Sequence, residues 1–127
     1  MRKNINFEEL KGETLTHISG DLVGSEQIFF STESGRLFVM EHDQNCCESV
    51  TIDDICGNLE DLIGDPILLA EEISNSDNYE DNNYDDDSFT WTFYKLSTIK
   101  ADITIKWYGT SNGYYSEEVT FREILPN

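Results

Sequence analysis

The C-terminal third of the chain alternates apolar and polar residues with a period of two. The pattern covers Phe89–Phe93 and Ala101–Trp107. Because successive side chains of a strand point to opposite faces, each segment is predicted to be a β-strand with one buried face. Tyr94 and Leu96 are out of phase with the first segment. Their position predicts either a bulge near Phe93 and Tyr94 or a strand that is covered on both sides.

Shorter runs of strand-forming residues precede this region, and turn residues separate them. These runs are Thr14–Ser19, Gln27–Thr32, Arg36–Glu41, Ser49–Ile52 and Pro66–Ile73. Their spacing favours antiparallel pairing. Between the second and third runs, a two-residue loop formed by Ser34 and Gly35 would pair Phe30 with Val39.

Two segments carry helix signals instead. In Asn4–Leu10, Asn6 is a plausible N-cap, and in Asn58–Gly64 an N-cap residue precedes acidic residues and a terminating glycine. A chain of 127 residues is large enough for one core. We therefore expect residues 1–127 to form a single acidic, mainly β (α+β) domain. It should be an antiparallel twisted sheet or small sandwich of about eight strands, with one or two short helices packed against it.

A tyrosine-rich segment follows the second alternating strand. If that strand forms a hairpin with a last strand, Ile105 would pair with Val119 and Ile103 with Phe121, which leaves a five-residue loop. Exposed tyrosines among small residues are typical of recognition loops. The alternative is that Trp107 and one tyrosine belong to the core. The candidate partner-binding residues here are Tyr108, Asn112, Tyr114 and Tyr115.

The negative charge is concentrated in one part of the chain. The net charge is -18, and the span from Leu37 to Tyr94 holds 16 of the 26 acidic residues and none of the 8 basic ones. Within it, residues 74–88 lack any apolar period and are predicted to form an acidic loop. The candidate partner-binding residues of this loop are Asp77, Glu80, Asp81, Asp85, Asp86 and Asp87.

This charge restricts the possible partners. Direct binding of nucleic acid is disfavoured, because affinity there comes from cations that displace counterions from phosphates. Anionic membranes are disfavoured for the same reason. We therefore expect a protein partner with a basic surface, such as a nucleic-acid-binding enzyme, while the oligomeric state stays open.

The sequence also predicts the compartment. No apolar run approaches the roughly 20 residues that cross a bilayer, and Met1–Ile5 is not followed by the apolar region of a signal peptide. Three cysteines fit no disulfide framework, and a disulfide between the adjacent Cys46 and Cys47 is expected to be strained. These features favour the cytoplasm.

The densest polar cluster runs from Glu41 to Glu48. His42, Cys46 or Cys47 and a neighbour could bind zinc, but the paired-ligand spacing of zinc sites is missing. A cysteine activated by His42 and oriented by a carboxylate is a second alternative. The favoured interpretation is a turn between two strands, with the cysteines packed inward as small hydrophobes. We accordingly expect no cofactor.

Several strings together resemble an uncharacterised family of small phage and bacterial proteins. They are Gly12–Gly20 with the pattern G-x-x-L-x-x-I-x-G, His42–Val50 with H-x-x-x-C-C-E, Asn58–Gly64, Trp91–Lys95 and Trp107–Ser116 with W-Y-G-x-S-N-G-Y-Y. The resemblance implies no known activity. It implies a phage or mobile-element setting, where small acidic proteins often inhibit host defence.

The leading hypothesis is a non-catalytic acidic binding protein of phage or mobile-element type. It would act in the host cytoplasm as a nucleic-acid mimic that docks on a basic surface of a host nucleic-acid enzyme, much as anti-CRISPR proteins do. One alternative is a metal- or thiol-dependent protein centred on His42, Cys46, Cys47 and Glu48. Another is a small-molecule binder that uses the aromatic loop at 107–115. The acidity could also serve solubility alone.

Overall fold

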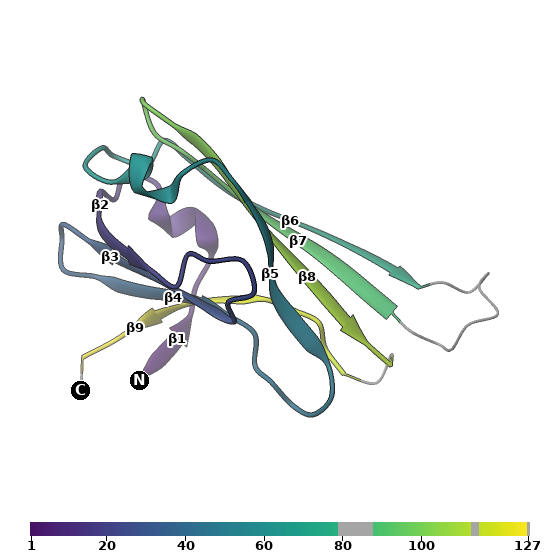
Figure 1. The fold of residues 1–127 in the computed structure, drawn as a ribbon. Helices are drawn as coiled ribbons and strands as arrows, with labels where there is room; N and C mark the ends of the chain where they lie inside the picture. Colours follow the sequence, from purple (N-terminus) through teal and green to yellow (C-terminus); the bar gives the residue numbers. More distant parts are fainter. Residues whose placement is uncertain (79–87, 113–114, 127) are drawn as a thin grey trace.

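Two antiparallel sheets face each other in the structure (Figure 1). The computed structural model describes residues 1–78, 88–112 and 115–126, without the side chains of 76–78. The five-stranded sheet has the order β1 (Arg2–Asn4), β9 (Thr120–Ile124), β4 (Leu37–Glu41), β3 (Gln27–Thr32) and β2 (Leu15–Ser19). The four-stranded sheet has the order β5 (Ser49–Cys56), β8 (Asp102–Ser111), β7 (Ser88–Ser97) and β6 (Leu69–Asn78).

Two short 3-10 helices accompany the sheets, η1 (Phe7–Leu10) and η2 (Leu59–Leu62). Both have the expected N-caps, since Asn6 and Asn58 accept hydrogen bonds from the backbone N–H groups two residues further on, at 2.9 and 3.1 Å. Each helix buries two apolar side chains. The predicted mainly β fold with short helices is confirmed.

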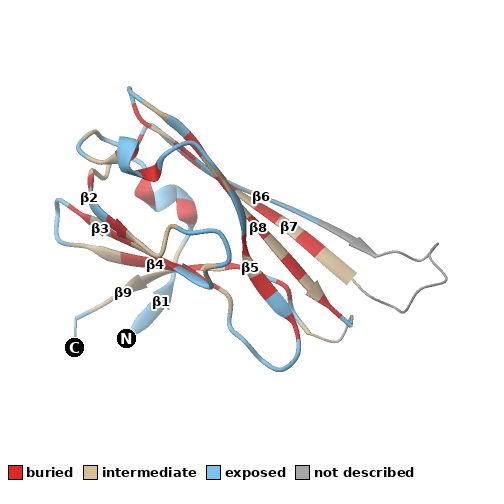
Figure 2. Cartoon of the chain, viewed as in Figure 1, coloured by how far each residue is buried: buried red, intermediate tan, exposed pale blue. Residues whose placement is uncertain are grey.

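The core lies between the inner faces of the two sheets, where buried and more exposed residues alternate along the strands (Figure 2). Phe7 of η1 joins the layers, because its ring lies 4.7 Å from that of Tyr94 in β7 and 5.0 Å from that of Phe121 in β9, between centroids. Trp107 of β8 is fully buried, and its Nε1–H donates to Met40 Sδ of the opposite sheet at 3.1 Å. Large aromatic side chains therefore bridge the two layers.

Strand β7 is regular and buries the face opposite to the predicted one. Its register against β6 and β8 is unbroken from Ser88 to Ser97, so the bulge near Phe93 is absent from this strand. The side chains that β7 buries are Thr90, Thr92, Tyr94 and Leu96. Phe89, Trp91 and Phe93 lie on the outer face and are half-buried. The alternation predicted the strand correctly and its inner face wrongly.

The register explains which face of β7 is buried. Thr92 pairs with Trp107, and Tyr94 pairs with Ile105. Directly opposite residues of an antiparallel pair share a face. Because the odd-numbered residues of β8 are the apolar ones, their burial takes the even-numbered residues of β7 into the core.

The β3–β4 hairpin forms, but its register differs by one residue from the prediction. Phe30 pairs with Phe38 rather than with Val39. The loop has three residues instead of two, because Thr32 N–H donates to Arg36 O at 3.0 Å and Gly35 turns the chain with φ of 89°. A three-residue loop with a left-handed glycine is a common hairpin connection. This register buries both phenylalanines.

After β8 the chain crosses to the other sheet instead of returning as a hairpin. β8 pairs with β5 and β7, whereas β9 pairs with β1 and β4. The predicted pairing of Ile105 with Val119 and of Ile103 with Phe121 is therefore wrong. All four side chains still enter one core, from opposite layers. The predicted hairpin and the observed crossover bury the same apolar residues, so the apolar pattern does not distinguish between them.

The segment predicted as an acidic loop at 74–88 is partly strand. Residues 74–78 pair with β7, from Ser74 opposite Thr92 to Asn78 opposite Ser88. Continuous pairing with β7 overrides the polar composition here, because an edge strand does not need an apolar period on its exposed side. Positions 79–87 lie outside the described residues. The predicted sites Glu80, Asp81, Asp85, Asp86 and Asp87 lie there too, and the backbone of Asp77 lies in β6.

Gly20 offers a test of the fold, because its backbone is left-handed and a neighbouring strand leaves no room for a Cβ atom. Its φ is 84°, and an added Cβ would lie 2.2 Å from the backbone oxygen of Gln27. Gly24 has a similar φ of 90° but nothing within 4 Å. Gly24→Ala should lower the free energy of unfolding by about 1 kcal/mol, from backbone strain alone. Gly20→Ala should cost about 2 kcal/mol more, since the backbone of β3 must move. Urea unfolding checks this, and equal losses in the two variants would contradict the close approach.

Candidate functional site

Residues 42–48 connect the two sheets, and their polar groups converge on Glu48. Its carboxylate accepts from His42 Nε2 at 2.8 Å and from the N–H groups of Asn45 and Cys46 at 2.9 Å each. The Glu48 side chain is fully buried. Burial alone would raise the pKa of Glu48, but the hydrogen bonds from Cys46, His42 and Asn45 outweigh it and lower the pKa to about 2. The turn is therefore organised around one buried, ionised carboxylate.

His42 lies between two hydrogen-bond acceptors. Its Nδ1 is 2.7 Å from the carbonyl oxygen of Glu118, and its Nε2 is 2.8 Å from Glu48. Both ring nitrogens are therefore engaged in hydrogen bonds within the protein. Neither nitrogen faces an open position from which it could bind a metal.

The cysteines of the turn differ from two expectations. Cys46 and Cys47 form a disulfide, with an S–S distance of 2.24 Å, and both residues are exposed rather than packed inward. The backbone N–H of Cys46 donates to Glu48, so the main chain rather than the sulfur atoms contacts the buried centre of the turn. In the disulfide form neither cysteine is a thiolate nucleophile or metal ligand.

The residues around the turn also indicate that the turn has a structural role. No group of three or more His, Cys, Asp or Glu side chains in the described part of the chain is arranged to hold a metal ion. Asp43 of the turn accepts a hydrogen bond from Arg122, which lowers the pKa of this carboxyl. An open hollow of about 370 Å³ adjoins the turn. Its lining residues are His42, Asp43, Gln44, Asn45, Glu48, Ser116, Glu118 and Thr120.

Two further carboxylates are buried, and each accepts hydrogen bonds from three side chains. Glu41 of β4 accepts from Arg2 at 2.8 Å, from Gln27 at 2.8 Å and from Arg122 at 3.1 Å. Glu117 accepts from three hydroxyl groups, with Thr90 at 2.7 Å. The other two donors are Ser88 and Ser111. Acidic residues at these positions stabilise the fold and are not available to a partner.

The remaining described carboxylates of the acidic span lie mainly on the two edges of the four-stranded sheet. We call Asp53, Asp54, Glu60, Asp61, Glu71 and Glu72 the edge carboxylates. They are exposed and lie on β5, on η2 directly after it, and on β6. β5 and β6 are the two outermost strands of this sheet. Negative charge therefore flanks both sides of the sheet.

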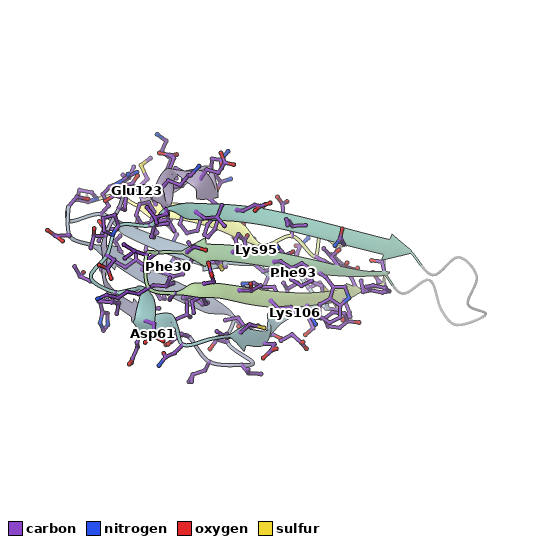
Figure 3. All side chains as sticks on the ribbon, turned by 90° about the horizontal axis from the view of Figure 1, so that it is seen from above. Phe30, Asp61, Phe93, Lys95, Lys106 and Glu123 are labelled. Carbon is purple, nitrogen blue, oxygen red and sulfur yellow. A yellow bond between two sulfur atoms is a disulfide. The ribbon has the colours of Figure 1, made fainter. Side chains whose placement is uncertain are left out.

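The outer face of this sheet carries aromatic side chains between the charged edges. We call Phe89, Trp91, Phe93 and Tyr108 the aromatic face. Trp91 and Tyr108 lie opposite each other on β7 and β8, with ring centroids 4.2 Å apart. Lys106 Nζ lies 4.2 Å from the centroid of the Trp91 ring, within cation–π distance. Figure 3 shows Phe93, Lys95 and Lys106 on this side of the sheet.

The structure places the residues of the tyrosine-rich candidate site in different environments. Trp107 belongs to the core, which the alternative interpretation predicted. Tyr108 joins the aromatic face, Asn112 is exposed beyond the end of β8, and Tyr115 is half-buried. Tyr114 lies outside the described residues. Sequence reasoning missed Trp91 and Phe93 as surface residues, although the phase change at Tyr94 and Leu96 was the available signal.

Removing the charge of Glu48 tests the role of the turn. The pKa of Glu48 is lower in the folded protein than in the unfolded chain, so its carboxylate stabilises the fold above about pH 5. That contribution should disappear as pH falls from about 4.5 towards 2. Glu48→Gln should therefore lower the free energy of unfolding near neutral pH, and the difference from the unaltered protein should shrink over that acidic range.

Urea unfolding at a series of pH values gives this difference. The control is Glu26→Gln, which removes an exposed carboxylate outside the turn. A difference for Glu48→Gln that stays constant down to pH 2 would show that the turn does not depend on the ionised carboxylate.

Comparison with known proteins gives a family but no activity. No curated protein and no solved structure matches the chain. Among the described residues, no helix is long and apolar enough to cross a membrane. One family model matches residues 8–121, a span that includes the turn around Glu48 and the aromatic face. The chain therefore belongs to the family described as Domain of unknown function (DUF7448).

Proposed function

We propose that this chain is a non-catalytic acidic binding protein that docks on a basic surface of another protein. The partner would be a nucleic-acid enzyme whose basic groove normally holds phosphates, so that the chain acts as a nucleic-acid mimic. We further propose a phage or mobile-element setting, in which this binding would inhibit a host defence enzyme in the host cytoplasm. Complementary charge speeds and directs such an association.

The observation that supports this proposal is the division of the carboxylates into two groups. Glu41, Glu48 and Glu117 are buried and bound by donors of the fold. The edge carboxylates are exposed, and within the described residues only Asp53 among them has an ion-pair partner, Lys106 at 3.8 Å. Uncompensated surface charge repels itself and contributes little to the fold, so its concentration favours a role in binding.

The metal- or thiol-dependent alternative has less support. Both ring nitrogens of His42 are engaged, and Cys46 and Cys47 are joined to each other. The small-molecule alternative relies on the aromatic loop at 107–115, and the structure places Trp107 of this segment in the core and Tyr108 on the outer face of the sheet. Solubility is the remaining alternative, and it predicts that only the total charge matters.

Two variants of equal net charge separate binding from solubility. The edge variant combines Asp54→Asn, Glu60→Gln, Asp61→Asn and Glu71→Gln. The control variant combines Glu8→Gln, Asp21→Asn, Glu26→Gln and Glu33→Gln. Each variant is immobilised and used to capture proteins from a nuclease-treated bacterial lysate. The edge variant should retain about tenfold less of the captured basic protein than the control variant, because it lacks the complementary charges.

Salt provides the second measurement in this experiment. Capture by the unaltered protein should weaken between about 50 and 500 mM salt, because exposed charges are screened beyond about 8 Å at physiological ionic strength. Equal capture by the edge and control variants, or capture that is insensitive to salt, would contradict docking through the edge carboxylates.

A further inference from the structure

The outer face of the four-stranded sheet has an unusual composition for a surface that no described segment covers. Antiparallel sheets with one open face normally present polar residues there. Here β7 presents Phe89, Trp91 and Phe93, and β8 presents Tyr108. The helices and the five-stranded sheet lie on the other side or at the ends of this layer (Figures 1 and 3). The aromatic face is therefore apolar surface that the fold does not use for its core.

The rings of this face are held in place before any partner binds. Trp91 contacts Tyr108 at 4.2 Å between centroids, and Phe89 lies 6.2 Å from Tyr108. Lys106 packs over Trp91 and pairs in register with Phe93. Rigid aromatic side chains lose little conformational entropy on binding, which is why they are frequent at the centres of protein interfaces.

The charges around the aromatic face indicate what can bind there. Lys106 Nζ lies 3.8 Å from Asp53, whereas Lys95 lies opposite Glu71 in the β6–β7 register without forming an ion pair with it. The edge carboxylates that belong to this outer face are Asp53 and Asp54 on β5 and Glu71 on β6, so its rim carries three negative charges against two lysines. A phosphate backbone would be repelled by this rim. A second copy of this chain would bring the same negative rim, which would also oppose association.

We infer that the aromatic face is the centre of the docking surface, and that the partner is a protein that inserts an apolar side chain between flanking cations. This inference rests on the proposed function. It adds the location of the contact on this chain and the kind of side chains that the partner brings to it. An apolar centre with a charged rim is the usual arrangement of a protein interface. In this arrangement the rim directs approach, and the aromatic face holds the bound partner.

Two synthetic peptides of equal length and charge test the inference. One alternates arginine with leucine, and the other alternates arginine with serine. Calorimetry should show that the arginine–leucine peptide binds the unaltered protein at least about tenfold more tightly, because only its leucines can contact the aromatic face. This difference should vanish in Trp91→Ala and in Phe93→Thr. It should persist in Ile99→Ala, which removes an exposed apolar side chain outside the aromatic face.

Near-ultraviolet circular dichroism from the buried Trp107 verifies that each variant is folded. Equal binding of the two peptides by the unaltered protein would overturn the inference. A preference that survives in both folded aromatic variants would also overturn it. Failure of the arginine–serine peptide to bind at low salt would instead count against the proposed function itself, so the two failures are distinguishable.

Two other occupants of the aromatic face would overturn the inference as well. Binding of a thymidine oligonucleotide that is lost in Trp91→Ala would make the face a base-stacking platform. Concentration-dependent dimers in sedimentation that are lost in the same variant would make it a contact between two copies of this chain.

Discussion

Burial of the odd-numbered side chains of β8 is the constraint on which the rest of the structure depends. Ile103, Ile105 and Trp107 enter the core, and the pairing register then decides the orientation of every residue in β7. Because opposite residues share a face, the threonines of β7 point inward and its aromatic residues point outward. The aromatic face is thus a direct consequence of how the core is packed.

The same core divides the acidic residues into two kinds. Where β4 and β5 join the two sheets, Glu41 and Glu48 are buried and held by arginine, histidine and backbone groups. Glu117 is held by hydroxyl groups of β7 and β8. These residues contribute to the net charge but not to the exposed surface. What a partner can meet is the aromatic face with its negative rim, and this combination links the fold to the proposed binding.

Much of the fold was predictable because local signals act over few residues. Alternation located β7 and β8, and the asparagine caps located η1 and η2. The errors concern choices that such signals leave open. A three-residue loop shifted the β3–β4 register, and apolar residues of β9 fit one core equally well from either sheet. The pattern from His42 to Glu48 predicts a turn, but it does not reveal the burial of Glu48, whose carboxylate accepts from His42 and from backbone N–H groups of the turn.

Trp91 is half-buried on the outer face of the sheet and Trp107 is fully buried in the core, so the two tryptophans of the chain report on the two faces separately. Trp107→Phe leaves only Trp91 as a fluorophore, and Trp91→Phe leaves only Trp107. Acrylamide quenching of the folded variants measures the accessibility of each ring. The structure predicts that Trp91 is quenched several times more strongly than Trp107. Equal protection of both rings, or stronger quenching of Trp107, would contradict the assignment of faces and the docking surface that depends on it.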